Sequence, residues 1–233
     1  MRRHMSAVIG HRGWPSRFPD NTLSGLLAAA TVADAVEVDV RRCADGKLIL
    51  SHDPDLAGYL VSTHGWAVLG ELDLGAGHHP VLLDEALGAL PDTPLMLEVK
   101  NLPHQPGFEP DHRMGHETAS RARPGDVVTS FHWPTVDAVR RQFPDVATGL
   151  ILGKSGDLAQ AIEHCLEAGH SAIVPEHRLL RSGQDRNLVA DSGLDVYVWT
   201  VNDLGEAEEL AGIGVSGIIT DDPGLISSLR KSQ

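Results

Sequence analysis

Two histidines bracket a pair of carboxylates in the first quarter of the chain. His11 follows the apolar run AVIG, Glu37 and Asp39 lie two residues apart in AVEVDV, and His52 follows LILS. Histidine titrates near neutral pH and therefore suits general acid and base chemistry, whereas hard divalent cations prefer carboxylate oxygens. These residue types favour a metal-assisted cleavage of phosphate diesters as the leading hypothesis.

Glu37 and Asp39 should project from the same face of one strand. Side chains alternate along a strand, so Val36, Val38 and Val40 would take the opposite face and meet helices. Two neighbouring carboxylates repel each other unless a proton or a cation offsets their charge, and Mg²⁺ or Ca²⁺ fits this oxygen set better than Zn²⁺ does. The sequence AVEVDV is equally compatible with an acidic pair on the surface of an edge strand.

Glu98 and Lys100 repeat this spacing in LMLEVK. Glu98 could complete an oxygen ligand set, and Lys100 could face the same cavity as a point charge for phosphate. The alternative is that Lys100 extends to solvent and simply pairs with Glu98. Arg12 directly follows His11, and arginine is the residue preferred for bidentate contacts to phosphate.

Eight short apolar runs alternate with segments in which apolar residues recur every three or four positions. The runs cover residues 7–11, 35–40, 94–100, 126–131, 148–153, 171–177, 195–201 and 217–221. This alternation is typical of βα units around a parallel sheet, and eight such units close into a barrel. We therefore predict an α/β fold of the (β/α)8 TIM barrel type.

Two segments interrupt the alternation of strands and helices. Residues 42–52 contain a turn at Asp45-Gly46 followed by an extra strand, LILSH, and residues 53–80 show no clear period. We expect a small insertion after the second strand. The length of 233 residues is usual for one α/β barrel, so we expect a single domain over residues 1–233.

Several polar residues stand where helix caps are expected. These are Asn21 before TLSG, Asp157 before LAQA, Asn202 or Asp203 before LGEA, and Asp221-Asp222 before Pro223. We predict capping for all of them and assign no catalytic role to Asp221 or Asp222.

Composition limits the classes of partner and compartment. The net charge is −13 and Lys/Arg-rich runs are absent, which argues against binding of nucleic acid or of an anionic bilayer. The sequence contains no apolar stretch of membrane-spanning length and no signal-peptide pattern, so we expect a cytoplasmic protein without a membrane span. Cys43 and Cys165 are expected to be reduced thiols. The oligomeric state is not defined by the sequence.

Five ordered motifs resemble the glycerophosphodiester phosphodiesterase family. HRGWPSRFPDNT is similar to the H-R-G…P-E-N-T opening of that family, and EVDV, SHD and LEVK follow in the family's order. The later segments SFHWPTVDAVRRQFPDV, VYVWTVND and GIITDDP resemble the family's later strand ends. The resemblance covers nearly the whole chain.

This resemblance implies a set of roles. Glu37, Asp39 and Glu98 would bind one divalent cation, Mg²⁺ or Ca²⁺ with Mn²⁺ possible; His11 and His52 would be the acid/base pair; Arg12 and Lys100 would hold the phosphate; and Phe131 and Trp199 would border the glycerol or alcohol end. The implied reaction converts a small-molecule glycerophosphodiester to glycerol 3-phosphate and an alcohol.

One position departs from the family pattern, because Asp20 replaces the glutamate of P-E-N-T. Its side chain is one methylene shorter, so the contact of that glutamate is not carried over. Alternative functions are a related phosphodiesterase acting on lysophospholipids or phosphoinositol diesters, or a non-catalytic barrel that binds a phosphorylated ligand.

Overall fold

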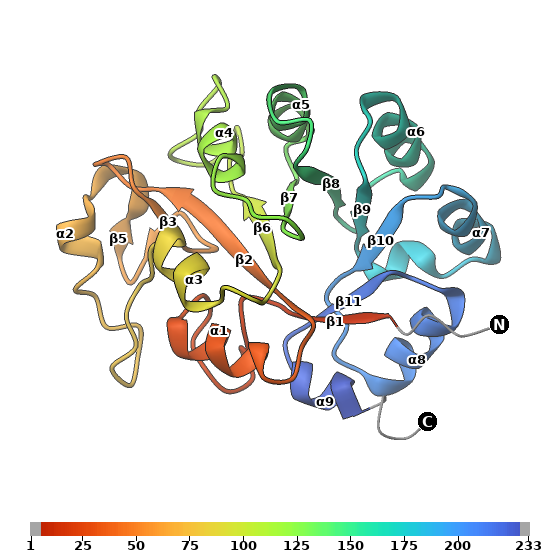
Figure 1. Cartoon of the computed structure of the whole chain (residues 1–233), viewed down its shortest axis with the longest axis horizontal. Coiled ribbons are helices and arrows are strands. Elements are labelled where there is room, and N and C mark those ends of the chain that lie inside the picture. Colours follow the sequence, from red (N-terminus) through yellow and green to blue (C-terminus); the bar gives the residue numbers. More distant parts are fainter. Residues whose placement is uncertain (1–5, 229–233) are drawn as a thin grey trace.

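Eight parallel strands form a closed ring in the computed structural model, which describes residues 6–228 (Figure 1). In ring order they are β1 (Ala7–Gly10), β2 (Ala35–Arg42), β6 (Leu95–Val99), β7 (Val127–Ser130), β8 (Ala147–Leu152), β9 (Ala172–Pro175), β10 (Asp195–Val198) and β11 (Gly217–Thr220). Pairing of Ile9 with Ile219 joins the first and last strands and closes the ring. The predicted (β/α)8 barrel is confirmed.

Helices surround the ring on its outer side, as Figure 1 shows. They are α1 (Leu23–Ala30), α3 (Leu83–Ala89), α4 (Arg113–Ala119), α5 (Trp133–Gln142), α6 (Leu158–Ala168), α7 (Gly183–Asp191), α8 (Leu204–Ile213) and α9 (Pro223–Ser227), with a 3-10 turn η2 (His177–Leu180) after β9. The outward valines of β2 are fully buried in one apolar cluster with residues of α1 and α3. The expected valine face is therefore confirmed.

The inside of the barrel changes from apolar to charged along the strands. Ile9, Met96, Ile151, Val174 and Ile219 form a compact apolar cluster within the ring. Polar and charged side chains follow at the carboxyl ends of the strands. This end of a barrel is where enzymes of this architecture carry their sites.

The predicted insertion lies after β2. Its first strand, β3 (Leu48–Leu50), pairs antiparallel with the end of β2, and a turn at Gly46 with φ +85° connects the two. The stretch without period contains the hairpin β4 (Asp55–Leu56) and β5 (Tyr59–Leu60), the 3-10 turn η1 (Val61–Thr63) and the helix α2 (Trp66–Leu69). These elements are too short for a visible hydrophobic period. They pack on a small apolar cluster of their own that includes Ile49 and Leu69.

Three of the predicted helix caps are confirmed. Asp157, Asp203 and Asp222 each accept a hydrogen bond from a backbone N–H in the first turn of the following helix. The prediction for Asn21 is wrong, because Thr22 caps α1 by accepting from Gly25 N. Asn21 instead has φ +57° and turns its side chain toward Asp39.

Two expectations from composition can be compared with the described residues. Within residues 6–228, no helix combines the length and apolar character needed to cross a membrane. Cys43 and Cys165 are buried free thiols, and burial raises their pKa values to about 11 and about 12. Such thiols are protonated near neutral pH and hence unreactive.

Candidate active site

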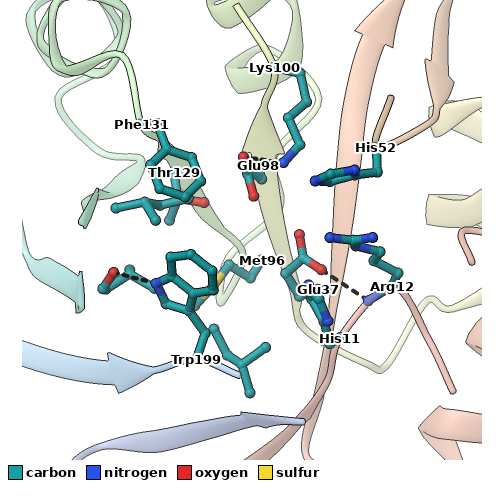
Figure 2. Close-up of a pocket in the computed structure, with 13 residues that line it drawn as sticks. His11, Arg12, Glu37, His52, Met96, Glu98, Lys100, Thr129, Phe131 and Trp199 are labelled. Carbon is teal, nitrogen blue, oxygen red and sulfur yellow. Dashed lines mark hydrogen bonds and ion pairs between the residues drawn. The ribbon is translucent and has the colours of Figure 1, made fainter. Parts of the chain in front are cut away.

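The carboxyl ends of the strands surround a cavity of about 120 Å³. It is lined by His11, Arg12, Glu37, His52, Met96, Glu98, Lys100, Thr129, Phe131, Ile151, Val174, Trp199 and Ile219 (Figure 2). Eight of the nine predicted site residues are in this set. The ninth, Asp39, lies behind the wall and is fully buried.

Three carboxylates converge at one side of the cavity. Glu37 and Asp39 point inward from β2, and Glu98 points inward from β6, where it is the register partner of Asp39. One carboxylate oxygen of each residue lies within 4.8 Å of the others, and all three side chains are buried. The alternative of an acidic pair on the surface of an edge strand is therefore wrong.

Lys100 is buried among these carboxylates. Its Nζ lies 2.8 Å from Asp39 Oδ1 and 2.5 Å from Glu98 Oε1. Burial opposes a charge on Lys100, but the negative charges of Glu98 and Asp39 outweigh it and raise the lysine pKa. The pairing with Glu98 is observed, whereas the alternative in which Lys100 extends to solvent is wrong.

Arg12 connects the first βα turn to the same group. Its backbone N–H donates to Glu37 Oε2 at 2.9 Å, and its Nε lies 3.2 Å from Asp39 Oδ2. Its Nη1 donates to Asp20 at 2.8 Å. Asp20 therefore reaches Arg12 although it is shorter than the glutamate of the related pattern.

The cluster of three carboxylates, Glu37, Asp39 and Glu98, has the properties of a cation site. Glu37 Oε1 is buried without a hydrogen-bond partner among the described residues. Burial and the charges of Asp39 and Glu98 raise the pKa of Glu37 well above its usual value. Burial would raise the Asp39 pKa as well, but Lys100 and Arg12 lower it to about 2. Because these three carboxylates form ion pairs with just two cationic side chains of residues 6–228, Lys100 and Arg12, an all-oxygen donor set for Mg²⁺ or Ca²⁺ fits the residues present.

Each of the two histidines has its Nδ1 held by a carboxylate. His11 Nδ1 lies 2.6 Å from Asp221 Oδ1, and His52 Nδ1 lies 2.8 Å from Asp53 Oδ1. A carboxylate accepts hydrogen bonds, so Nδ1 carries the proton and Nε2 is left as the reactive nitrogen of each ring. Burial and the charge of Lys100 lower the pKa of His52, which keeps that ring neutral.

The opposite side of the cavity is apolar (Figure 2). The Phe131 and Trp199 rings meet edge to face with centroids 5.4 Å apart. Trp199 Nε1 donates to Val174 O at 2.9 Å, which fixes the indole plane. The cavity thus places a charged wall against an aromatic one.

The sequence did not indicate three polar residues of this site. Asp221 holds His11, and Asn21 makes two hydrogen bonds to Asp39, although both were assigned to capping. Thr129 lines the cavity with a buried hydroxyl that has no partner in the described chain. The positions of Asp221 directly after β11 and of Thr129 on β7 were the available signals, because strand ends face the site.

Comparison with known proteins agrees with this geometry. The sequence profile of the glycerophosphoryl diester phosphodiesterase family matches residues 11–225. The chain is 28% identical to a glycerophosphodiester phosphodiesterase of Caldanaerobacter subterraneus over 96% of this chain and 98% of that one. It is 26% identical to the glycerophosphodiester phosphodiesterase of Bacillus subtilis over 96% of this chain and 86% of that one.

A solved structure has the same fold. The Oleispira antarctica phosphodiesterase in complex with the product sn-glycerol-3-phosphate superposes with a TM-score of 0.84 at 23% identity, covering 97% of each chain. The fold and the site define a phosphoric diester hydrolase built on a TIM barrel. The chain belongs to the glycerophosphoryl diester phosphodiesterase family.

Proposed function

We propose that the protein converts glycerophosphodiesters to glycerol 3-phosphate and an alcohol in a reaction that depends on a divalent cation and on His11 and His52. The observation that carries this proposal is the buried group of three carboxylates, one oxygen of which lacks a partner, on the wall that also carries both histidines. The expected cytoplasmic location and the single-domain organisation stay predictions.

Glu37, Asp39 and Glu98 are the residues that would hold Mg²⁺ or Ca²⁺. A bound cation supplies Lewis acidity toward the phosphoryl oxygens. Arg12 and Lys100 both line the cavity and would carry positive charge to the phosphate. Asn21 holds Asp39 from behind through its side-chain amide, so the carboxylate keeps one orientation.

The two histidines divide the proton transfers. His52 is neutral because its pKa is lowered by burial and by Lys100, so its Nε2 accepts the proton of the nucleophile. His11 delivers a proton to the leaving oxygen, and the Asp221 carboxylate at its Nδ1 holds the ring in place. The nucleophile is water or the 2-hydroxyl of the glycerol, in which case a cyclic phosphate precedes the product.

Cavity size supports a small diester over a lysophospholipid. The volume of about 120 Å³ is small beside the roughly 300–1,000 Å³ of sites that enclose drug-sized ligands. The aromatic wall of Phe131 and Trp199 gives the glycerol carbons an apolar surface opposite the charged one. The product named for the Oleispira structure, sn-glycerol-3-phosphate, is likewise a small molecule without an acyl chain.

Activity assays test the proposal. Glycerophosphocholine, glycerophosphoinositol and lysophosphatidylcholine are supplied with Mg²⁺, Ca²⁺, Mn²⁺ or chelator. We expect turnover of the first two with a cation, and a kcat about 10²- to 10⁴-fold lower in His11→Ala and in His52→Ala. His79→Ala is the control, because His79 is exposed, hydrogen-bonds to the Leu72 carbonyl and is not among the residues that line the cavity.

Two results would contradict the proposal. Full activity in both histidine variants would remove their assignment. Wild-type protein whose melting temperature rises with glycerophosphocholine but which releases no product under any cation would select the non-catalytic, ligand-binding alternative.

A further inference from the structure

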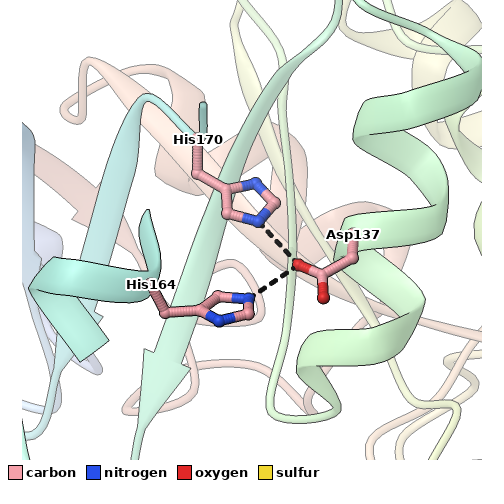
Figure 3. A group of neighbouring side chains, drawn as sticks. All are labelled: Asp137, His164 and His170. Atoms are coloured by element: carbon pink, nitrogen blue, oxygen red, sulfur yellow. Dashed lines mark hydrogen bonds and ion pairs between the residues drawn. The ribbon is translucent and has the colours of Figure 1, made fainter. Parts of the chain in front are cut away.

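A second group of possible metal ligands lies outside the barrel. It consists of Asp137 on α5, His164 on α6 and His170 in the turn before β9 (Figure 3). His170 contacts Thr148 at the amino end of β8, whereas the candidate active site lies at the carboxyl ends of the strands. The two groups are therefore at opposite ends of the strands and share no residue.

The three side chains are already arranged around a common point. His164 Nε2 and His170 Nε2 lie 3.0 and 2.9 Å from the same atom, Asp137 Oδ1. The two imidazole planes differ by 22° with centroids 6.1 Å apart, and both rings direct Nε2 toward Asp137 (Figure 3). In a tetrahedral zinc site with bonds near 2.1 Å, ligand atoms are about 3.4 Å apart. The two Nε2 atoms would have to move only a few tenths of an ångström away from Asp137 Oδ1 to make room for the ion.

Metal binding need not release the hydrogens that the two histidines carry on Nε2. Burial opposes ionisation of Asp137, but hydrogen bonds from both histidines lower its pKa, so it is a carboxylate and both Nε2 atoms carry hydrogen in the metal-free arrangement. Coordination through Nε2 moves each hydrogen to Nδ1. In His170 the new Nδ1–H can donate to Thr148 Oγ1, which lies 2.8 Å away. The same hydroxyl can donate to Nδ1 when that nitrogen carries no hydrogen.

The surroundings of the three side chains bury one of them and leave the other two partly accessible to solvent. The His170 side chain has no exposed surface, and burial lowers its pKa, which keeps it neutral as a ligand must be. Asp137 and His164 are 18% and 34% exposed, so solvent can reach the group and supply a fourth ligand. The Trp133 ring lies 5.2 Å from the His164 ring and limits its movement.

We propose that Asp137, His164 and His170 form a Zn²⁺ site that ties α5, α6 and the start of β9 together. Two imidazole nitrogens and one carboxylate oxygen suit Zn²⁺, whereas Mg²⁺ and Ca²⁺ prefer oxygen alone. The bound ion stabilises the folded chain because the unfolded chain does not present the three ligands together.

Zinc titration against a chromophoric competing chelator tests the proposal. Excess Mg²⁺ is present to occupy the cluster of Glu37, Asp39 and Glu98 in the barrel. We expect one zinc site in the wild type, loss of that site in Asp137→Asn and in His164→Gln, and an affinity about 10- to 100-fold lower in Thr148→Val. Zinc should raise the melting temperature of the wild type and leave that of His164→Gln unchanged.

Glu163→Gln is the matched control, because Glu163 is an exposed carboxylate next to His164 on α6. It should bind zinc as the wild type does. Equal zinc affinity in the wild type and in His164→Gln would overturn the proposal, as would an equal loss in Glu163→Gln. Thermal melting of each variant without zinc shows whether that variant is folded. If Asp137→Asn does not fold, His164→Gln, which changes a partly exposed side chain, still tests the proposal.

Discussion

At the scale of single residues, the candidate site depends on carboxylates that hold imidazoles. Asp221 accepts from His11 Nδ1 and also from Asn202 Nδ2 at 2.7 Å, so its orientation is fixed from two sides. Burial opposes ionisation of Asp221, but these hydrogen bonds lower its pKa and keep it charged. Asp221 is therefore a positioning residue for His11, the proposed proton donor.

Replacing Asp221 should impair turnover without unfolding the protein. We expect Asp221→Asn to lower kcat by about 10²-fold, because a misplaced catalytic group costs this much, while KM changes little. Asp222→Asn is the control, since Asn caps a helix as well as Asp does and Asp222 does not contact His11. Steady-state kinetics of both variants decide the matter, and a wild-type kcat in Asp221→Asn would remove the positioning role.

The pH dependence of turnover should report His52. Burial and Lys100 lower the pKa of His52 below its ordinary 6.5, and a general base acts only when it is deprotonated. On the acidic side, activity should therefore be lost only below pH 6.5. Asp53→Asn should move this acidic limb to lower pH still, since the Asp53 hydrogen bond raises the His52 pKa. An acidic limb centred above pH 6.5 in kcat/KM would contradict the assignment.

At the scale of elements, one strand organises most of the charged wall. Glu37, Asp39 and Arg41 alternate along β2 and face inward. Arg41 donates from Nε and Nη2 to the His52 carbonyl at 3.0 and 2.7 Å, so β2 also fixes the segment that carries this histidine.

Weakening this tie should displace His52. We expect Arg41→Lys to lower kcat by about 10²-fold, because lysine cannot make both hydrogen bonds from a planar group. Arg42→Lys is the matched control on the same strand, where Arg42 pairs with Glu109 and Glu117 instead. Stopped assays at saturating substrate compare the two, and equal kcat values in both variants would refute the role of Arg41.

The elements themselves were largely predictable from periodicity. Strand alternation correctly separated the valines of AVEVDV from its carboxylates. Five helices, α1, α3, α5, α6 and α8, follow three- and four-residue repeats, whereas α4 and α7 were not predicted. The segment 53–80 was not predictable, because its strands have two residues each and its helical turns three and four. The cap of α1 was assigned to Asn21 rather than Thr22 because asparagine is the more favoured capping residue of the two, whereas the structure uses the Thr22 hydroxyl.

At the scale of the whole molecule, ring closure brings distant residues together. Asp221 and His11 are separated by 210 positions and meet because β11 pairs with β1. The sequence places Asp221 at a strand end but does not place it beside His11, which is why its role was missed while the residues in the ordered motifs were found. The buried position of Asp39 behind Lys100 was unpredictable for the same reason, since it depends on the packing of β2 against β6.

The net charge also acts at this scale. A chain of net charge −13 repels anionic substrates as a whole, so the proposed function requires local attraction of the phosphate, which we assign to Arg12, Lys100 and the proposed cation. Because the pKa of Glu37 is raised, cation binding must displace its proton, and the affinity for the cation should increase with pH.

Calorimetric titration of Mg²⁺ or Ca²⁺ into the wild type and Glu37→Gln at neutral pH tests the shared cation site most directly. We predict one site in the wild type and an affinity at least about 10-fold lower in Glu37→Gln, because a charged oxygen ligand is lost. Asp84→Asn, which alters an exposed carboxylate on α3 that pairs with Arg121, should bind as the wild type does. Equal cation affinities in the wild type and Glu37→Gln would contradict a site formed by Glu37, Asp39 and Glu98.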